Sequence, residues 1–232
     1  TLEEKMLHTM HPHQDVAFID KNRADFFTET IDSKTATQFS NLETVINAIW
    51  ISKVNSNHRV LVCGIGSIGI LLAQTLKHYI KAQVTVRENN LAKSDALKNW
   101  GFALCDDTSE YDICFNVSAH QEGLQYCIDH TVTEGKIIEL SWYGTQAIHL
   151  ILGVNFHYKR LQLISSQVSD IPLEFQNEHT FQTRKKLAEE LLQHIDYSKF
   201  ITRIIPFEEL PSFFKEIRDG KTNSDFITIV KY

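Results

Sequence analysis

The feature that most constrains this chain is a cluster of three glycines between a short apolar segment and a helical pattern. Residues 59–63 (RVLVC) lead into Gly64, Gly66 and Gly69. Apolar residues then recur at helical spacing, at Ile68, Leu71, Leu72 and Leu76. Strand, tight turn and helix are therefore predicted in that order. Gly64 would permit the turn, Gly66 would leave space free in front of the helix, and Gly69 would let the helix pack closely on the strand.

The same alternation continues beyond the glycines. Strands are predicted at 59–63, 83–88, 102–105, 112–117, 135–140 and 161–166, and helices at 68–80, 91–101 and 119–129. Apolar strands that alternate with helices indicate a parallel sheet covered on both faces. The fold class is thus α/β, a Rossmann doubly wound parallel sheet.

The two flanks differ from this central unit. Before it we predict a strand at 17–20, an irregular polar segment, and an amphipathic helix at 41–53 capped by Asn41. After it we predict two helices, at 180–195 and 208–220, and two strands, at 201–207 and 226–232. The predicted division is a central unit at 41–200, with the two chain ends, 1–40 and 201–232, meeting around a second, smaller structure.

The glycine turn predicts a dinucleotide site. Backbone N–H groups and the positive end of the helix dipole would face a pyrophosphate in front of Gly66. Glu88 ends the second strand, where a carboxylate can accept both hydroxyls of the adenosine ribose. That carboxylate would repel a 2′-phosphate, so NAD(H) is favoured over NADP(H), although the adjacent Arg87 leaves NADP(H) open.

Two alternatives remain for the glycine turn. In the first, the turn serves packing alone, with no ligand in front of it. Adenosyl-methionine methyltransferases also place a glycine turn and an acidic residue at these positions, but their loop is closer to G-x-G-x-G. The third glycine, Gly69, occupies the helix-packing position of the dinucleotide pattern.

Charge and composition exclude several other classes of function. The chain has 23 basic and 29 acidic residues, a net charge of -6, which predicts no nucleic-acid partner and no membrane surface. Its start has charges and histidines where a secretory segment is apolar, and its apolar runs are too short to span a bilayer. Its four cysteines form no C-x-x-C pair and are expected to be free thiols in a reducing compartment. A soluble, cytoplasmic protein is predicted.

From residue 41 onward the chain resembles the cofactor-binding half of the zinc-type medium-chain alcohol dehydrogenase family. The segments that carry the resemblance are VLVCGIGSIGILLAQ, VTVRENNLAKSDALKNWGFA, YDICFNVSAHQEGLQYCID and EGKIIELSWYG, followed by the closing strand–helix–strand. The resemblance implies that Lys93 helps to hold the adenosine ribose. The expected cofactor-binding positions are Gly64, Ile65, Gly66, Ser67, Ile68, Gly69, Glu88, Asn89, Lys93, Val117, Ser118, Leu140, Ser141, Trp142 and Ser165, with Ser166 beside the last of them.

The resemblance also implies a metal position. Glu43 falls where the family places a cysteine or glutamate zinc ligand, and Asn47, one turn later, would approach the nicotinamide. A glutamate in a first helical turn is also a common response to the helix dipole. An alternative metal site would consist of His8, His11 and His13, while His120 and His130 are expected to be solvated residues at helix ends.

The resemblance further implies an oxidoreductase that transfers hydride between nicotinamide and an alcohol or carbonyl substrate, with zinc assistance in the full-length protein. The family's other zinc ligands and its proton-relay residue belong to an N-terminal domain. The resemblance therefore implies that residues 1–40 are the remnant of a second, mostly β catalytic domain formed by the two chain ends, that 41–200 are the NAD-binding Rossmann domain, and that 201–232 are a strand–helix–strand unit that packs back toward the catalytic domain. The non-methionine Thr1 suggests that the chain is incomplete. A homodimer joined through sixth-strand edges is expected by analogy. The alternative is a catalytically incomplete dinucleotide-binding or interaction module.

Overall fold

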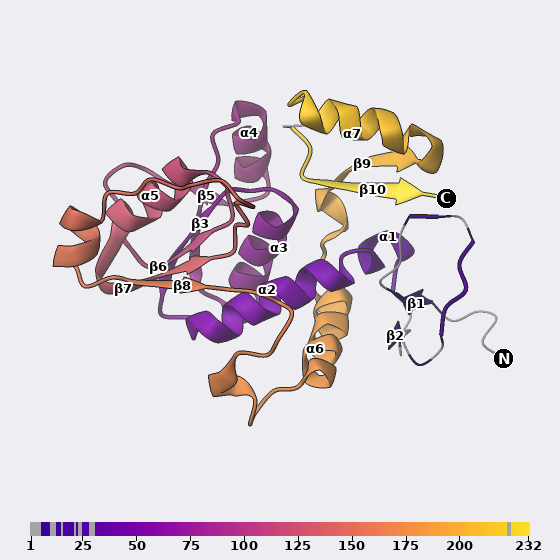
Figure 1. The fold of residues 1–232 in the computed structure, drawn as a ribbon, viewed down its shortest axis with the longest axis horizontal. Coiled ribbons are helices and arrows are strands. Elements are labelled where there is room, and N and C mark those ends of the chain that lie inside the picture. Colours follow the sequence, from indigo (N-terminus) through magenta and orange to yellow (C-terminus); the bar gives the residue numbers. More distant parts are fainter. Residues whose placement is uncertain are drawn as a thin grey trace.

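A computed structural model describes residues 6–9, 13–14, 16–20, 22, 25–27, 31–221 and 224–232. Its central feature is a six-stranded parallel sheet with strand order β5-β4-β3-β6-β7-β8 (Figure 1). The strands are β3 (Arg59–Cys63), β4 (Gln83–Arg87), β5 (Ala103–Leu104), β6 (Tyr111–Asn116), β7 (Thr131–Glu139) and β8 (Gln162–Ser165). The chain builds outward from β3 to β5, then crosses back to β6 and builds outward to β8. This order confirms the predicted Rossmann fold.

Helices cover both faces of this sheet. They are α2 (Phe39–Ser52), α3 (Ser67–Thr75), α4 (Leu91–Asn99), α5 (Gln121–His130) and α6 (Phe181–His194), with single π-helical turns η2 (Leu76–Ile80) and η3 (Leu152–Phe156) and short 3-10 turns η4 (Leu173–Phe175), η5 (Ser198–Phe200) and η6 (Phe207–Glu209). Gly101, with φ of 75°, follows α4 and supplies the left-handed stop that its sequence predicted. Thr180 caps α6 through a reciprocal capping box with Thr183.

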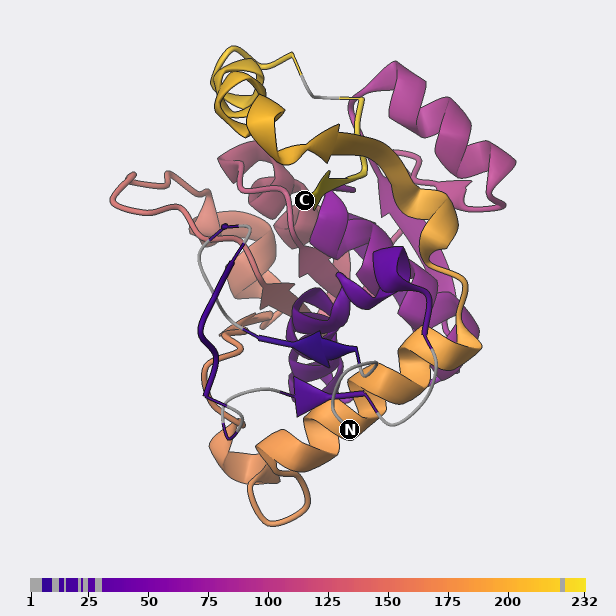
Figure 2. The same cartoon turned by 90° about the vertical axis from the view of Figure 1, so that its right-hand side faces the viewer.

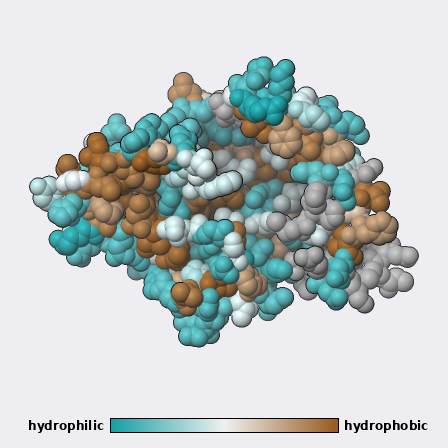
Figure 3. Space-filling view, in the orientation of Figure 1, coloured by the Kyte–Doolittle hydropathy of each residue, from teal (hydrophilic) through white to brown (hydrophobic). Residues whose placement is uncertain are grey.

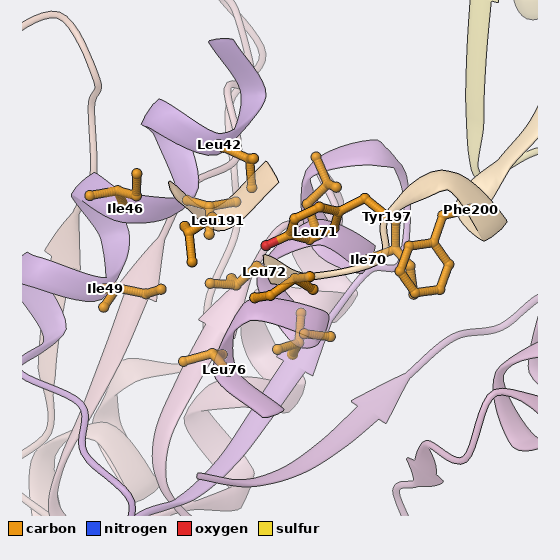
Figure 4. Close-up of a cluster of buried hydrophobic side chains, with 14 of the residues drawn as sticks. Leu42, Ile46, Ile49, Ile70, Leu71, Leu72, Leu76, Leu191, Tyr197 and Phe200 are labelled. Carbon is orange, nitrogen blue, oxygen red and sulfur yellow. The ribbon is translucent and has the colours of Figure 1, made fainter. Parts of the chain in front are cut away.

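The larger core lies where α2, α3 and α6 meet one face of the sheet. Figure 4 shows Leu42 and Ile46 of α2 pointing toward Leu191 of α6 and Leu71 of α3. The hydroxyl of Tyr197, which is buried there, pairs with Thr75 Oγ1 at 2.8 Å. On the other face, α5 packs Leu124, Cys127 and Ile128 against Leu61, Cys63, Cys114 and Ile137. The four cysteines are free, and three of them are buried.

The chain ends form two small separate sheets. The strands β1 (Leu7–His8) and β2 (Asp25–Phe26) pair antiparallel, and β9 (Ile201–Pro206) pairs in parallel with β10 (Ile227–Lys231), with α7 (Leu210–Arg218) between them. Figures 1 and 2 place this C-terminal unit at the opposite end of the α2–α3 layer from α6. The division into three domains at residues 40 and 200 stays a prediction.

Three local predictions were wrong. Residues 17–20 form no strand, and the strand that pairs with β1 is β2, later in the chain. The second helix begins at Phe39 after Gln38, so Asn41 lies inside it and not at its cap. The segment expected to be irregular contains α1 (Ser33–Ala36), which begins because Asp32 accepts a hydrogen bond from the backbone N–H of Thr35.

Candidate functional site

A cleft of about 600 Å³ opens at the carboxyl ends of β3, β4 and β6, where the strand order reverses. Doubly wound sheets bind their ligands at this position. Eight of the expected cofactor-binding residues line it, namely Gly64, Ile65, Gly66, Glu88, Asn89, Lys93, Val117 and Ser118. Sequence reasoning did not assign Cys63, Asn90 or His120 to the cleft, and it treated Arg87 only as a reservation, yet these four residues line it too.

The three glycines have different structural roles. Gly64 has φ of 93°, and a Cβ there would lie 2.5 Å from the Ser118 Cα. A Cβ on Gly69 would lie 2.0 Å from the Gly64 carbonyl oxygen. At Gly66, by contrast, a Cβ would meet no atom of the described residues within 4 Å. Packing therefore explains Gly64 and Gly69, whereas the missing side chain of Gly66 leaves space only on the cleft side.

The helix that follows presents an unblocked N-terminus to this space. Gly66 is the N-cap of α3, and no side chain among the described residues caps the first N–H groups of the helix. These N–H groups and the helix dipole together favour an anion. The loop and the helix thus provide the backbone donors that a pyrophosphate needs.

Two backbone hydrogen bonds hold the Glu88 carboxylate beside the glycine loop. Its Oε1 accepts a hydrogen bond from the Asn90 backbone N–H at 2.9 Å, and its Oε2 accepts one from the Ile65 N–H at 3.3 Å. A carboxylate has about four acceptor positions, so lone pairs remain for hydroxyl donors. The carboxylate is therefore fixed in place and still able to accept hydrogen bonds from a ribose.

Lys93 and the C-terminal unit form one wall beside Glu88. The Lys93 Nζ donates to the Ile65 carbonyl at 3.3 Å and lies 5.1 Å from the centre of the Phe226 ring. Burial lowers the pKa of Lys93, and the Glu88 and Asp225 carboxylates oppose that shift. Ser67 Oγ donates to the Phe226 carbonyl at 2.9 Å. Phe226 thus joins the residues before β10 to the glycine loop, which no periodicity in the sequence predicted.

Arg87 is anchored at the other side of the cleft. Its guanidinium carbon lies 4.2 Å from the centre of the Tyr126 ring, a cation–π contact. The Tyr126 hydroxyl in turn donates to the Asp106 carbonyl at 3.0 Å. His120 is exposed at the start of α5, and His130 stacks on Tyr126 at its end. Arg87 therefore lines the cleft beside Glu88, while its guanidinium packs on a side chain of α5.

The expected residues on β7 and β8 lie outside the cleft. Trp142 is 88% exposed, Ser165 is also exposed, and Leu140 packs partly against the core. Ser141 Oγ accepts a hydrogen bond from the Ala119 N–H at 3.0 Å and so ties the loop after β7 to the loop after β6. Ser67, Ile68 and Gly69 also lie outside the cleft lining, in the first turn of α3.

A polar network connects the ends of β6 and β7. The fully buried Asn116 donates through Nδ2 to Glu139 Oε2 at 2.8 Å and to the Tyr143 hydroxyl at 2.9 Å. Its Oδ1 accepts from Ser118 Oγ at 2.7 Å. Burial and then the Glu139 carboxylate raise the pKa of Tyr143 to about 12, so its phenol remains protonated. The network links Ser118 in the cleft to the exposed loop after β7.

Glu43 is paired with an arginine. Its Oε1 lies 3.2 Å from Nε of Arg184 on α6, and the two side chains are only 12% and 5% exposed. Asn47, one turn later, donates to the Gln167 carbonyl at 3.0 Å, and its buried Oδ1 has no partner among the described residues. His11 lies outside the described residues. Among the residues that the structure describes, no group of three His, Cys, Asp or Glu side chains could hold a metal ion, and the ionic partner of Glu43 is Arg184.

A second hollow, of about 460 Å³, lies between α2, η2 and α6. Its lining is mainly aliphatic and aromatic, and the polar groups at its rim are already engaged. Lys53 pairs with Glu174 at 2.7 Å, and the Trp50 and His179 rings stack at 4.0 Å. It offers no convergent polar groups to a ligand, in contrast to the glycine cleft.

Comparison with solved structures identifies the same fold in dehydrogenases. L-idonate 5-dehydrogenase of Escherichia coli matches with a TM-score of 0.73 and 17% identity over 93% of this chain and 62% of its own. 2R,3R-butanediol dehydrogenase of Bacillus subtilis matches at 0.72 and 16% identity, covering 92% and 62% of the two chains. A short chain alcohol dehydrogenase of Escherichia coli CFT073, complexed with NADH, matches at 0.71 and 16% identity, covering 88% and 61%.

These similarities confirm, at the level of the fold, the resemblance to zinc-type dehydrogenases. The chain spans about three fifths of the length of the solved structures that it matches. Neither protein-family models nor curated proteins gave a match. No helix among the described residues is both long enough and apolar enough to span a membrane.

Proposed function

We propose that this chain binds NAD(H) in the Gly66 cleft and belongs to an oxidoreductase that acts on an alcohol or carbonyl substrate. The observation that carries the proposal is the open space at Gly66. The glycine lies at an uncapped helix N-terminus and faces a fixed carboxylate, yet no internal contact of the described residues requires it to lack a side chain. A ligand with a pyrophosphate next to a ribose explains all three features.

The residues divide between the parts of the cofactor. Gly66 and the first N–H groups of α3 would bind the pyrophosphate, and Glu88 would accept the adenosine-ribose hydroxyls. Lys93 would contribute its positive charge beside that ribose, because its ammonium already lines the cleft. When bound, the nicotinamide supplies hydride transfer.

The remaining expected residues would face the other end of the cofactor. Val117 and Ser118 line the cleft on its β6 side. β7 and β8 are the neighbouring strands on that side, and they are followed or ended by the remaining residues: Leu140, Ser141 and Trp142 follow β7, and Ser165 ends β8. A dinucleotide that runs from Glu88 across Gly66 would place its nicotinamide toward these strand ends. Their role is to shield the ring from water and orient it.

We propose NAD(H) as the preferred cofactor. The Glu88 carboxylate would repel a 2′-phosphate at the position where it accepts ribose hydroxyls. Arg87, the cation that is nearest in sequence, is stacked on Tyr126. A dehydrogenase of Sinorhizobium meliloti with this fold was solved bound to NADP, at 16% identity and a TM-score of 0.68, so the fold alone does not select the cofactor.

The test is a titration of the wild-type chain and of Gly66→Val with NADH. Binding is measured by the fluorescence of NADH and of the chain's tryptophans. The valine would fill the pyrophosphate position, and we expect affinity to fall more than a hundredfold while the melting temperature stays unchanged. Gly153→Val is the matched control, because a Cβ there also meets no described atom within 4 Å and Gly153 lies in η3, away from the cleft.

Unchanged affinity in Gly66→Val would mean that the glycine turn serves packing alone. If the folded wild-type chain binds S-adenosyl-methionine and neither dinucleotide, it belongs to the alternative ligand class.

The second candidate function is a dinucleotide-binding or interaction module without turnover. Its motivation is that the described residues form no metal cluster and that the chain spans only part of its structural neighbours. NADH binding without oxidation of any alcohol in a panel with NAD⁺ would favour it.

We further propose a homodimer in the cytoplasm. β8 is an edge strand of the large sheet, and exposed apolar residues gather beside it at Ile151, Leu152, Val154 and Leu163. Figure 3 shows brown surface over this side of the molecule. Pairing of two β8 edges would cover unpaired backbone groups and these side chains. Four free cysteines suit a reducing compartment. A monomer in analytical ultracentrifugation would contradict the dimer for this chain.

A further inference from the structure

Glu43, at the position where the resemblance implies a zinc ligand, forms a buried ion pair with Arg184, so that a guanidinium already lies beside its carboxylate. The Arg184 Nε lies 3.2 Å from Glu43 Oε1, and the two side chains join α2 to α6. Glu43 lies in the second turn of α2, whose N-terminal half is at the carboxyl edge of the sheet because α2 runs antiparallel to β3. The pair therefore lies near the ends of β7 and β8.

Arg184 is held by more than Glu43. Its NH1 donates to the Val168 carbonyl at 2.9 Å, in the segment that follows β8, and its guanidinium carbon lies 5.2 Å from the centre of the Phe181 ring. A guanidinium stays charged at every pH at which a protein folds. Arg184 cannot lose its charge to make room for a metal, and it cannot leave Glu43 without an unpaired charge remaining in the interior.

A zinc ion at Glu43 would therefore compete with a resident cation. The Glu43 carboxylate keeps lone pairs beyond the one that Arg184 uses, but a metal ion bound to them would lie close to the guanidinium, and like charges this close repel each other strongly in a partly dry interior. We infer that Glu43 does not bind a metal in this protein, and that Arg184 supplies the fixed positive charge at this position in the fold. The inference concerns Glu43 alone and does not depend on whether the nucleotide cleft is filled.

The experiment measures metal content in four proteins: wild type, Glu43→Gln, Arg184→Met and the double variant. Each is incubated with excess Zn²⁺, freed of unbound metal by gel filtration and analysed by mass spectrometry of the metal. A parallel Co²⁺ sample is followed by visible absorption. We expect wild type and Glu43→Gln to hold the same amount of metal, and EDTA to leave the melting temperature of wild type unchanged.

Stability distinguishes the ion pair from chance proximity. Arg184→Met strands a buried carboxylate, so its melting temperature should fall by several degrees. Adding Glu43→Gln removes the stranded charge and should recover part of that loss. Arg184→Lys keeps the charge but loses the planar fork, and it replaces Arg184→Met if the latter does not fold. Strict additivity of the two single changes would mean that the pair is not coupled and would overturn the role of Arg184.

One zinc or cobalt per wild-type chain that Glu43→Gln removes would overturn the inference directly. Metal that is retained equally by both proteins binds elsewhere and agrees with it. Uptake of metal by Arg184→Met but not by the double variant would support it further, because removal of the guanidinium would have freed the Glu43 carboxylate. NADH titration of the same four proteins reports on the Gly66 cleft separately, so failure of either proposal is recognised without the other.

Discussion

The two ends of the sheet's carboxyl edge differ in how far their side chains are held by internal contacts and how far they are exposed. At the β3–β4 end, the glycine turn is fixed, Glu88 accepts two backbone hydrogen bonds, and Lys93 is buried against Phe226. At the β7–β8 end, Trp142 is 88% exposed, β8 is largely exposed, and Asn47 Oδ1 lacks a partner among the described residues. One end is preorganised by internal contacts, and the other is an open surface.

Chain connectivity explains this difference. At the β3–β4 end, one local stretch, residues 63–93, supplies the turn, the carboxylate and the lysine, and Phe226 is the distant residue that packs against the lysine. The β7–β8 end combines α2, the loop after β7 and the segment after β8, which are far apart in sequence. In a local unit, neighbouring parts of the sequence determine where the site residues lie. In a composite surface, their positions depend on how distant segments pack together. The comparison predicts that substitutions at the two ends will have unequal effects.

The largest expected effect is on stability, at Gly69. Gly69→Ala would place a Cβ 2.0 Å from the Gly64 carbonyl oxygen, so the first turn of α3 must move away from β3. We expect a loss of about 3 kcal/mol in the free energy of unfolding, measured by urea titration. Gly66→Ala is the control and should change that free energy by less than about 0.5 kcal/mol. Equal losses in both variants would mean that the glycine turn is not divided into packing and ligand roles.

The next effect concerns the network that joins the two ends. Asn116→Leu removes the donor to Glu139 and Tyr143 and the acceptor for Ser118. Partly buried polar groups would be left without partners, at a cost of about 2 kcal/mol in unfolding free energy. Tyr143→Phe removes only the hydroxyl, which is partly exposed, and should cost less than half as much. A larger loss in Tyr143→Phe would place the centre of the network in the open loop.

The signals for the preorganised end are local, so sequence patterns could group its residues, whose cofactor-binding roles stay a prediction. The spacing of Gly64, Gly66 and Gly69 and the acidic end of β4 define one unit, and the structure brings all of these residues except Gly69 into the cleft lining. Asn116 could not be recognised in this way, because its partners Glu139 and Tyr143 belong to another strand and its loop. The pairing of Glu43 with Arg184, 141 residues later, likewise depends on how α6 packs on α2. The strand expected at 17–20 failed for a related reason, since its polar surroundings gave no indication of which strands would pair.

A smaller effect tests cofactor choice at the preorganised end. Glu88→Gln removes the negative charge but keeps the shape of the side chain. We expect NADH affinity to fall about tenfold, or 1.4 kcal/mol, and NADPH affinity to hold or rise, as measured by fluorescence titration. Trp142→Phe, at the open end, should leave the ratio of the two affinities unchanged. An unchanged ratio in Glu88→Gln would remove Glu88 from the ribose position.

The smallest effect lies at the opposite, amino edge of the sheet, where Arg59 and Asp112 join β3 to β6. The Arg59 NH2 lies 2.9 Å from Asp112 Oδ1, and the Arg59 backbone N–H donates to Oδ2 at 2.8 Å. The hydrogen bond from the Arg59 side chain lowers the pKa of Asp112. A carboxyl whose folded pKa is depressed stabilises the protein above its unfolded pKa, near 4, and loses that contribution as pH falls through the folded value.

Asp112→Asn should therefore cost about 1 kcal/mol or less at pH 7, because the pair is partly exposed and screened by solvent. The difference from wild type should hold down to pH 5 and close below pH 4, in urea titrations at a series of pH values. Asp95→Asn, whose partner Lys98 is 3.6 Å away on an exposed helix surface, is the matched control and should show no such dependence. NADH affinity should not change in either variant, because neither aspartate lines the cleft. A loss of NADH affinity in Asp112→Asn equal to that in Glu88→Gln would mean that NADH affinity depends on contacts at the far edge of the sheet and not on the local β–α–β unit alone.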